Sequence, residues 1–109
     1  MEIKAKFWIE NKGEVVLGSG KAALLYAVHK KGSIQRAAEE FGMSYRHAWG
    51  IIKKMEQRAG FKLMKVQVGG GQGKGAYLTT HGKNLLEKFT LLEESLGKIT
   101  MEKFREIFQ

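Results

Sequence analysis

The 109-residue sequence has no cysteine and no proline, and its acidic residues are outnumbered by basic ones. Without cysteine there is no disulfide, no thiolate metal site and no cysteine nucleophile, which fits a reducing cytoplasm. No apolar run approaches the roughly 18 residues of a membrane span, and the N-terminus does not resemble a signal peptide. We therefore expect a cytoplasmic protein without membrane association, folded as one domain over residues 1–109.

Positive charge is abundant and unevenly placed. The 19 basic and 11 acidic residues give a formal net charge of +8. Residues 44–75 hold seven basic residues and one acid, Glu56, whereas residues 1–20 and 76–109 are each balanced. A concentrated basic segment points to a polyanionic partner, and the alternative is a lysine-rich solvated surface. Charge alone does not decide between the two.

The first half of the chain predicts a β-hairpin followed by three helices. Residues 1–18 alternate in polarity around a turn, as a hairpin does. Three helices are expected within residues 20–60, the first capped by Ser19 and ended by Gly32. The second and third fall within residues 33–60. They show apolar residues at the helical period and begin after Ser33 and Ser44.

The second half predicts two strands and then helices. Strand-like runs lie within residues 61–80 on either side of a glycine-rich segment. The C-terminal helices occupy residues 81–109, with Thr80 as the expected cap of the first. We expect Gly97 to interrupt that helix and Thr100 to cap a last short one. The fold class is thus α+β.

The helix pair at residues 33–60 meets the demands of a helix-turn-helix in one short window. Such a unit needs a small residue where the helices touch, a glycine in the turn, and apolar anchors around it. Ala38 is the small contact residue and Gly42 lies in the turn. The anchors are Phe41, Met43, Ala48, Ile51 and Ile52. An ordinary αα-hairpin with a coincidental glycine is the alternative.

A glycine-rich loop between two strands indicates a wing. Five of the seven residues at 69–75 are glycine, which tolerates positive φ and lets a backbone approach phosphates. Gln72 and Lys74 supply a hydrogen-bonding group and a charge at its tip. The alternative is a hairpin loop without contacts. After a helix-turn-helix, the wing is the interpretation we favour.

These motifs resemble a known family. The helix-turn-helix of LysR-type regulators is similar to the segment GSIQRAAEEFGMSYRHAWGIIKKMEQRAGFKLM. The N-terminal DNA-binding domain of ModE-type, molybdate-responsive regulators is closer still, through LGSGKAALLYAV, GSIQRAAEEFGMSYRHAW and GGGQGKGAYLTTHGKNLL. The resemblance covers about residues 4–92. It implies a winged helix-turn-helix that binds DNA as a dimer and controls transcription.

Two features depart from the family. Lys74 interrupts glycines that the family tends to keep unbroken, which adds a charge to the wing. Full-length ModE-type regulators carry oxyanion-binding domains after this one, and no such domain follows within the 109 residues. We therefore expect no molybdate or tungstate sensing here, and any effector would act through a separate sensing protein.

Three other kinds of site fit the sequence poorly. A dinucleotide fingerprint at residues 18–23 lacks the second strand and terminal acid that a Rossmann unit needs. The segment GGGQGKG departs twice from the Walker phosphate-binding pattern. His29, His47 and His81 fall on three different helices without metal-ligand spacing. We expect no enzymatic activity, no cofactor and no metal.

The docking geometry of helix-turn-helix proteins selects candidate DNA-binding residues. The third helix is expected to enter the major groove with its N-terminus first. Arg46 is then best placed for a bidentate contact with guanine, and Gly50 allows close approach. Lys53 and Lys54 lie about two turns further on, near phosphates. The expected set is Ser33, Ser44, Tyr45, Arg46, His47, Gly50, Lys53, Lys54, Gln72 and Lys74.

Two aromatic residues lie at the edge of the third helix's apolar stripe. Tyr45 is expected either at DNA or in the core, and Trp49 is assigned to the core.

The C-terminal helices carry apolar residues that one chain can hardly bury, and such stripes are usually partner surfaces. The family resemblance also implies pairing through these elements. The expected dimer interface is Leu85, Leu86, Phe89, Leu92, Leu96, Phe104 and Phe108. The alternative is a monomer whose last helix folds back over its own core.

The sequence therefore predicts a homodimeric, sequence-specific regulator of transcription that binds double-stranded DNA. The alternatives are a winged-helix protein-interaction module and a sequence-tolerant architectural nucleic-acid-binding protein.

Overall fold

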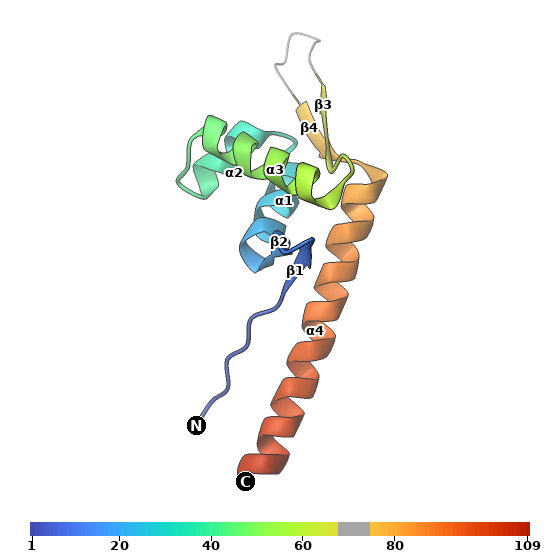
Figure 1. Ribbon diagram of the computed structural model, residues 1–109. Coiled ribbons are helices and arrows are strands. Elements are labelled where there is room, and N and C mark those ends of the chain that lie inside the picture. The colour runs from blue at the N-terminus through green and yellow to red at the C-terminus, as the bar shows by residue number, and fades with distance from the viewer. Residues whose placement is uncertain (68–74) are drawn as a thin grey trace.

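A computed structural model describes residues 1–67 and 75–109 of the chain. Its elements are β1 (Trp8–Asn11), β2 (Glu14–Gly18), α1 (Ser19–Lys31), α2 (Ile34–Glu40), α3 (Tyr45–Ala59), β3 (Met64–Gln67), β4 (Gly75–Leu78) and α4 (Thr80–Phe108). Three short helices form the body, β3 and β4 project from it, and α4 runs past the body and well beyond it (Figure 1). The α+β winged helix-turn-helix expected from the sequence is confirmed.

The first sheet is an antiparallel hairpin of β1 and β2, as expected. Its turn uses Lys12 and Gly13, both at positive φ, which glycine adopts freely and which matches the twist of a hairpin. Val16 and Leu17 of β2 are buried in the core. The hairpin therefore covers the body of helices with one strand and exposes the other.

The first helix begins earlier than expected. Ser19 is the first residue of α1 and not its cap, because Gly18 holds the extended cap position. The Ser19 hydroxyl instead donates a hydrogen bond to the Glu93 carboxylate of α4. At the other end Gly32 closes α1 in the left-handed conformation, as the sequence predicts. Ser19 thus ties α1 to α4.

The caps of the helix-turn-helix are confirmed. The Ser33 hydroxyl accepts the Arg36 amide at 3.1 Å at the start of α2. The Ser44 hydroxyl accepts the His47 amide at 3.0 Å at the start of α3. Each satisfies one of the free amides at a helix N-terminus and stabilises the helix by about 1 kcal/mol. The two serines therefore fix where both helices begin.

Small and large apolar residues share the core. Ala38 of α2 is 1% exposed, as its predicted place as the small contact residue requires. Each large side chain that is fully buried contributes roughly 1.5–3 kcal/mol. The largest of these are Phe89, Leu17, Leu25, Met55, Leu63 and Val28. They come from the hairpin, all but one of the helices and the segment before β3, so this core fixes α3 relative to the wing and α4.

The C-terminal segment is one helix and not two. α4 runs without a break through Gly97, and the Thr100 hydroxyl donates to the Leu96 carbonyl at 2.7 Å instead of capping a new helix. The cap at the start is Thr79, one residue before the expected Thr80, and its hydroxyl accepts the Gly82 amide at 3.0 Å. At 1.5 Å per residue the 29 residues of α4 extend about 44 Å.

Only part of the apolar stripe on α4 faces solvent. Phe89 is 2% exposed and belongs to the core of its own chain, and Leu85 and Leu86 pack against that core. All three were expected at a dimer interface; the body of the chain covers Phe89 fully and Leu85 and Leu86 in part. Further along, Glu93 bonds to Ser19 of α1, and Phe104 and Phe108 line a hollow with residues 1–4 of the same chain. Leu92 is half exposed, as is Ile99.

Candidate nucleic-acid interface

The outer surface of α3 carries two parallel rows of side chains. Ala48, Ile52 and Met55 point into the core, so the opposite side of the helix faces solvent. Arg46, Gly50 and Lys54 follow one another at four-residue spacing along this side. The second row, at the same spacing beside it, consists of Tyr45, Trp49 and Lys53.

Most of the predicted DNA-binding residues lie on this surface. Seven of the ten lie on α3 or cap it. They are Ser44, Tyr45, Arg46, His47, Gly50, Lys53 and Lys54. Ser33 lies at the start of α2, and Tyr45 lines the same depression as Ser33 and Val66 of β3. Gln72 and Lys74 lie outside the described residues. The structure therefore brings eight of the ten predicted residues to α3 and its immediate surroundings.

Trp49 was assigned to the core, and the structure corrects this. Its side chain is 42% exposed, and the Lys53 ammonium lies 5.1 Å from the ring centroid. Ala48 fills the position against the core, which leaves Trp49 on the flank of α3. A cation over an indole face is favourable, so Trp49 holds Lys53 beside the outer surface.

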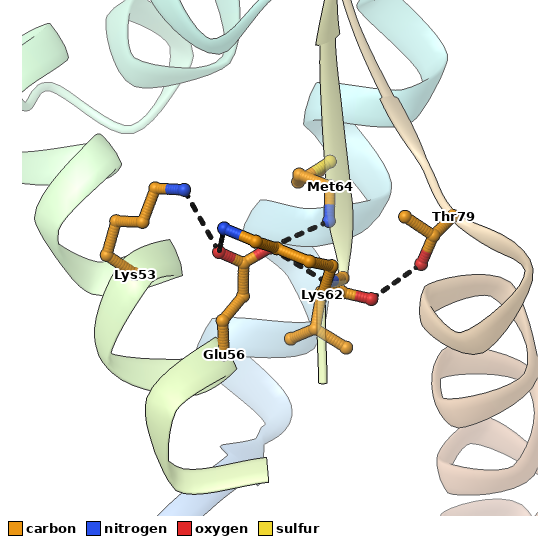
Figure 2. A network of polar contacts seen from close by, with 6 residues as sticks. Lys53, Glu56, Lys62, Met64 and Thr79 are labelled. Carbon is orange, nitrogen blue, oxygen red and sulfur yellow. Dashed lines mark hydrogen bonds and ion pairs between the residues drawn. The ribbon is translucent and has the colours of Figure 1, made fainter. Parts of the chain in front are cut away.

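Glu56, the one acid of the basic segment, is the centre of a polar network (Figure 2). Its side chain is 6% exposed, and Oε2 accepts the amides of Leu63 at 2.8 Å and Met64 at 3.1 Å. Oε1 faces the ammonium groups of Lys53 at 3.2 Å and Lys62 at 3.9 Å. The carboxylate therefore joins α3 to the segment that leads into β3.

The environment of Glu56 favours its charged form. Burial alone would raise the pKa of the carboxyl, since it disfavours the anion. The amides of Met64 and Leu63 and the Lys53 ammonium outweigh burial and hold the pKa of Glu56 below its ordinary value. Glu56 is thus an anion at neutral pH, and it offsets part of the positive charge of Lys53 and Lys62.

Arg58 also contributes to the basic segment, but it serves the fold. Its guanidinium donates to the Glu14 carboxylate at 3.1 Å and to the Val15 carbonyl at 2.9 Å. Its own carbonyl accepts the Asn11 side-chain amide at 2.7 Å. Arg58 therefore fastens the hairpin to the C-terminal end of α3. The outer surface of α3 owes its charge to Arg46, Lys53 and Lys54 instead.

The second sheet is anchored to α1. β3 and β4 pair antiparallel from Met64 opposite Leu78 to Gln67 opposite Gly75. The Ala76 amide donates to the Gly32 carbonyl at 3.0 Å, and the Leu78 amide donates to His29 Nδ1 at 3.0 Å. This sheet therefore stands beside α3 in a fixed orientation, as the root of a wing.

A close approach of backbones joins this sheet to α4. The Thr79 amide donates to the Leu63 carbonyl at 2.9 Å, and the Thr79 hydroxyl donates to the Lys62 carbonyl at 2.7 Å (Figure 2). A Cβ at Gly82 would overlap the Leu63 carbonyl oxygen. Gly82 is therefore needed for α4 to start where it does.

Across residues 1–67 and 75–109, the side chains of histidine and glutamate form no cluster of three that could hold a metal ion. In the same ranges, no helix combines the length and the apolar character needed to cross a membrane.

Sequence reasoning missed the roles of Glu56 and Trp49. The signal for Glu56 was available, because a lone acid among the seven basic residues of the segment 44–75 suggests a specific partner. The signal for Trp49 was its place at the edge of the apolar stripe, beside Ala48.

Three short helices with a capped, basic third helix, followed by an anchored two-stranded sheet, define a winged helix-turn-helix domain. Residues 21–83 match the family of bacterial regulatory helix-turn-helix proteins of the lysR type, and the chain belongs to this family.

The similar proteins agree with this assignment and confirm the resemblance to ModE-type regulators. The chain is 34% identical over 83 residues to the molybdenum-pterin-binding protein MopB of Rhodobacter capsulatus, covering 76% of this chain and 31% of MopB. It is 35% identical over 74 residues to the transcriptional dual regulator ModE of Escherichia coli (strain K12), covering 68% and 28%. The molybdenum transport protein ModE of Azotobacter vinelandii is 33% identical over 89 residues, covering 82% and 33%.

A solved structure shares the fold. ArgP from Mycobacterium tuberculosis matches with a TM-score of 0.53 and 31% identity, over 73% of this chain and 30% of ArgP. The chain thus spans about a third of the length of the proteins that it resembles.

Proposed function

We propose that this chain is a sequence-specific, double-stranded-DNA-binding regulator of transcription that acts in the cytoplasm. The observation that carries the proposal is the outer surface of α3, where Arg46, Lys53 and Lys54 stand around Gly50 beside a capped N-terminus. Membership of a family of regulatory helix-turn-helix proteins supports it. The role is one of binding, without a catalytic step.

In this proposal α3 enters the major groove with Ser44 and Tyr45 foremost. Arg46 reads a guanine through two parallel hydrogen bonds, because its guanidinium matches the guanine O6 and N7 acceptors. Lys54 lies four residues, or about one helical turn, after Gly50 and contacts a phosphate. The free amides at the start of α2, next to Ser33, hold a second phosphate.

The wing completes the contact. β3 and β4 stand beside α3 (Figure 1), so a duplex with α3 in its major groove would also pass close to this sheet. Gln72 and Lys74 then contact the backbone or the minor groove. Val66, which is 41% exposed on β3, lies near Tyr45 in the channel between helix and wing.

We also propose that the protein acts as a two-fold symmetric homodimer that binds an inverted repeat. Leu92, Leu96 and Ile99 continue the spacing of three and four residues that begins at Leu85 and Phe89, which is the pattern of a helix seam. Leu92 and Ile99 are each about half exposed in the single chain. Beyond them lie the expected interface residues Phe104 and Phe108. Their rings stack on each other with centroids 4.7 Å apart.

The test is binding of the full chain to random and selected duplexes across a range of salt concentrations. If a dimer contacts about 5–8 phosphates, log affinity falls against log salt with a slope of about −5 to −7. A slope near zero contradicts nucleic-acid binding. Steep salt dependence with no preference among sequences supports a sequence-tolerant architectural protein instead.

A further inference from the structure

A shallow depression lies on the outer surface of α3. Its volume is about 370 Å³, and it is lined by Ser44, Arg46, His47, Gly50, Ile51 and Lys54. The space over Gly50 is open, because a Cβ at this position would meet nothing within 4 Å. The missing side chain leaves a notch between Arg46 and Lys54 in the middle of their row.

The rim and the floor of this notch differ in chemistry. Hydrogen-bond donors stand around the rim, on Arg46, His47 and Lys54. The floor consists of the Gly50 backbone and the partly buried Ile51 side chain, which is apolar. A helix that only tracked phosphates would need no apolar hollow at the centre of its basic face.

The major groove offers one group that fits this hollow. Base edges there present hydrogen-bond donors and acceptors, with a single apolar protrusion, the C5-methyl group of thymine. We propose that the notch formed by Gly50 and Ile51 receives the C5-methyl of a thymine and makes thymine a required base in each half-site. The inference rests on the proposed DNA binding by α3 and specifies a base that it reads.

The place of this thymine follows from the helix. Arg46 and Gly50 are four residues apart, which is about 6 Å along α3. Successive bases are 3.4 Å apart along a strand. The thymine therefore lies within about two base pairs of the guanine that Arg46 contacts.

The experiment is a uracil scan of the selected operator. Each thymine of one half-site, and its symmetry mate, is replaced in turn by uracil, which keeps every hydrogen-bonding group and lacks only the methyl. Affinity of the full chain is measured by fluorescence anisotropy. Loss of one buried methyl group corresponds to about fourfold in affinity per half-site. We expect this loss at one thymine of each half-site and little change at the others.

Two alanine variants locate the effect. In Gly50→Ala the new methyl occupies the position over the Gly50 backbone that the thymine methyl takes in this proposal, so thymine and uracil there should bind with about equal affinity. Gly97→Ala is the matched control, because Gly97 is also a helical glycine with open space around its Cβ position. Both changes favour helix formation, so neither should unfold the chain. Gly97→Ala should keep the wild-type preference.

The possible results separate this inference from the function beneath it. If the protein selects an operator but tolerates uracil everywhere, the inference is wrong and the proposed function stands. The same holds if Gly50→Ala keeps the full preference for thymine. If the protein binds no operator, both fail.

Discussion

At the scale of the residue, Glu56 shows how one carboxylate positions two surfaces. Glu56 lies in α3, and its carboxylate accepts the amides of Leu63, just before β3, and of Met64, the first residue of β3. The carboxylate also faces the ammonium groups of Lys53 and Lys62. Because the wing and the outer surface of α3 both meet at this side chain, their relative orientation depends on its charge.

The pH dependence of Glu56→Gln tests this role. The folded state lowers the pKa of Glu56 from about 4.5, so the charged carboxylate stabilises the protein fully above that pH. This contribution is lost as pH falls through the lower, folded pKa. At neutral pH we expect Glu56→Gln to reduce the free energy of unfolding by about 1–3 kcal/mol. The measurement is urea unfolding of both proteins between pH 7 and pH 3.

Protonated glutamate and glutamine have nearly the same shape, so the two proteins should become equally stable in acid. Glu87→Gln, on the exposed surface of α4, serves as the control and should have little effect. A difference for Glu56→Gln that stays constant over the whole pH range would contradict the role assigned to its charge.

Arg46 and Lys54 occupy one row of α3 but should act differently. Arg46→Ala is expected to cost about 1–3 kcal/mol and to relax preference at one base position. Lys54→Ala should weaken binding to all sequences alike and flatten the salt slope by about two, because the proposed dimer loses one phosphate contact in each subunit. Selection of bound sequences with each variant, followed by salt titration, compares the two. An unchanged consensus for Arg46→Ala would show that another residue reads the base.

At the scale of the element, local signals predicted the helix-turn-helix well. Ser33 and Ser44 cap helices through hydroxyl-to-amide bonds three residues on, which depend only on neighbouring sequence. The same local logic failed at Gly97. One glycine inside a helix costs about 1 kcal/mol, which the surrounding residues of a long helix can offset.

Contacts between distant segments account for the remaining errors. Ser19 bonds to Glu93, 74 residues away, and no local pattern could have indicated that partner. Phe89 was assigned to a dimer because its stripe is continuous with Leu92. Whether the body of the chain covers a given residue depends on where α4 starts, and Thr79 and Gly82 set that through their contacts with Leu63.

Two glycines of α4 should therefore respond in opposite ways to alanine. Gly82→Ala forces a methyl group against the Leu63 carbonyl, and overpacking of this kind costs typically about 1–3 kcal/mol. Gly97→Ala meets open space and should stabilise the protein by about 0.5–1 kcal/mol. Thermal unfolding of the two variants beside the wild type makes the comparison. Equal and small effects would mean that the approach of α4 to Leu63 is looser than described.

At the scale of the whole molecule, α4 dominates the shape. The chain measures 60 Å along its longest axis and 21 Å along its shortest, because the distal part of α4 leaves the body (Figure 1). A long helix with apolar residues along one side is seldom left without a partner in solution.

Charge placed on this side of α4 should separate the proposed dimer. Ile99→Glu puts a carboxylate at the centre of the exposed stripe, and an unpaired charge buried at an interface is strongly unfavourable. Leu91→Glu is the matched control, since Leu91 is 63% exposed on a different side of the helix. Sedimentation should find Ile99→Glu monomeric at micromolar concentration and Leu91→Glu still paired. The Ile99 variant should also lose its preference for an inverted repeat over a half-site.

The length of α4 has a mechanical consequence. A rod about 44 Å long converts a small tilt at one end into a large displacement at the other. A tilt of about 5° at the distal end moves the opposite end by about 4 Å, close to the 3.4 Å rise of one base pair. In a dimer joined at the distal ends of α4, the distance between the two α3 helices would depend on the angle between the two α4 helices. Operators with one base pair more or less between half-sites would report that angle directly.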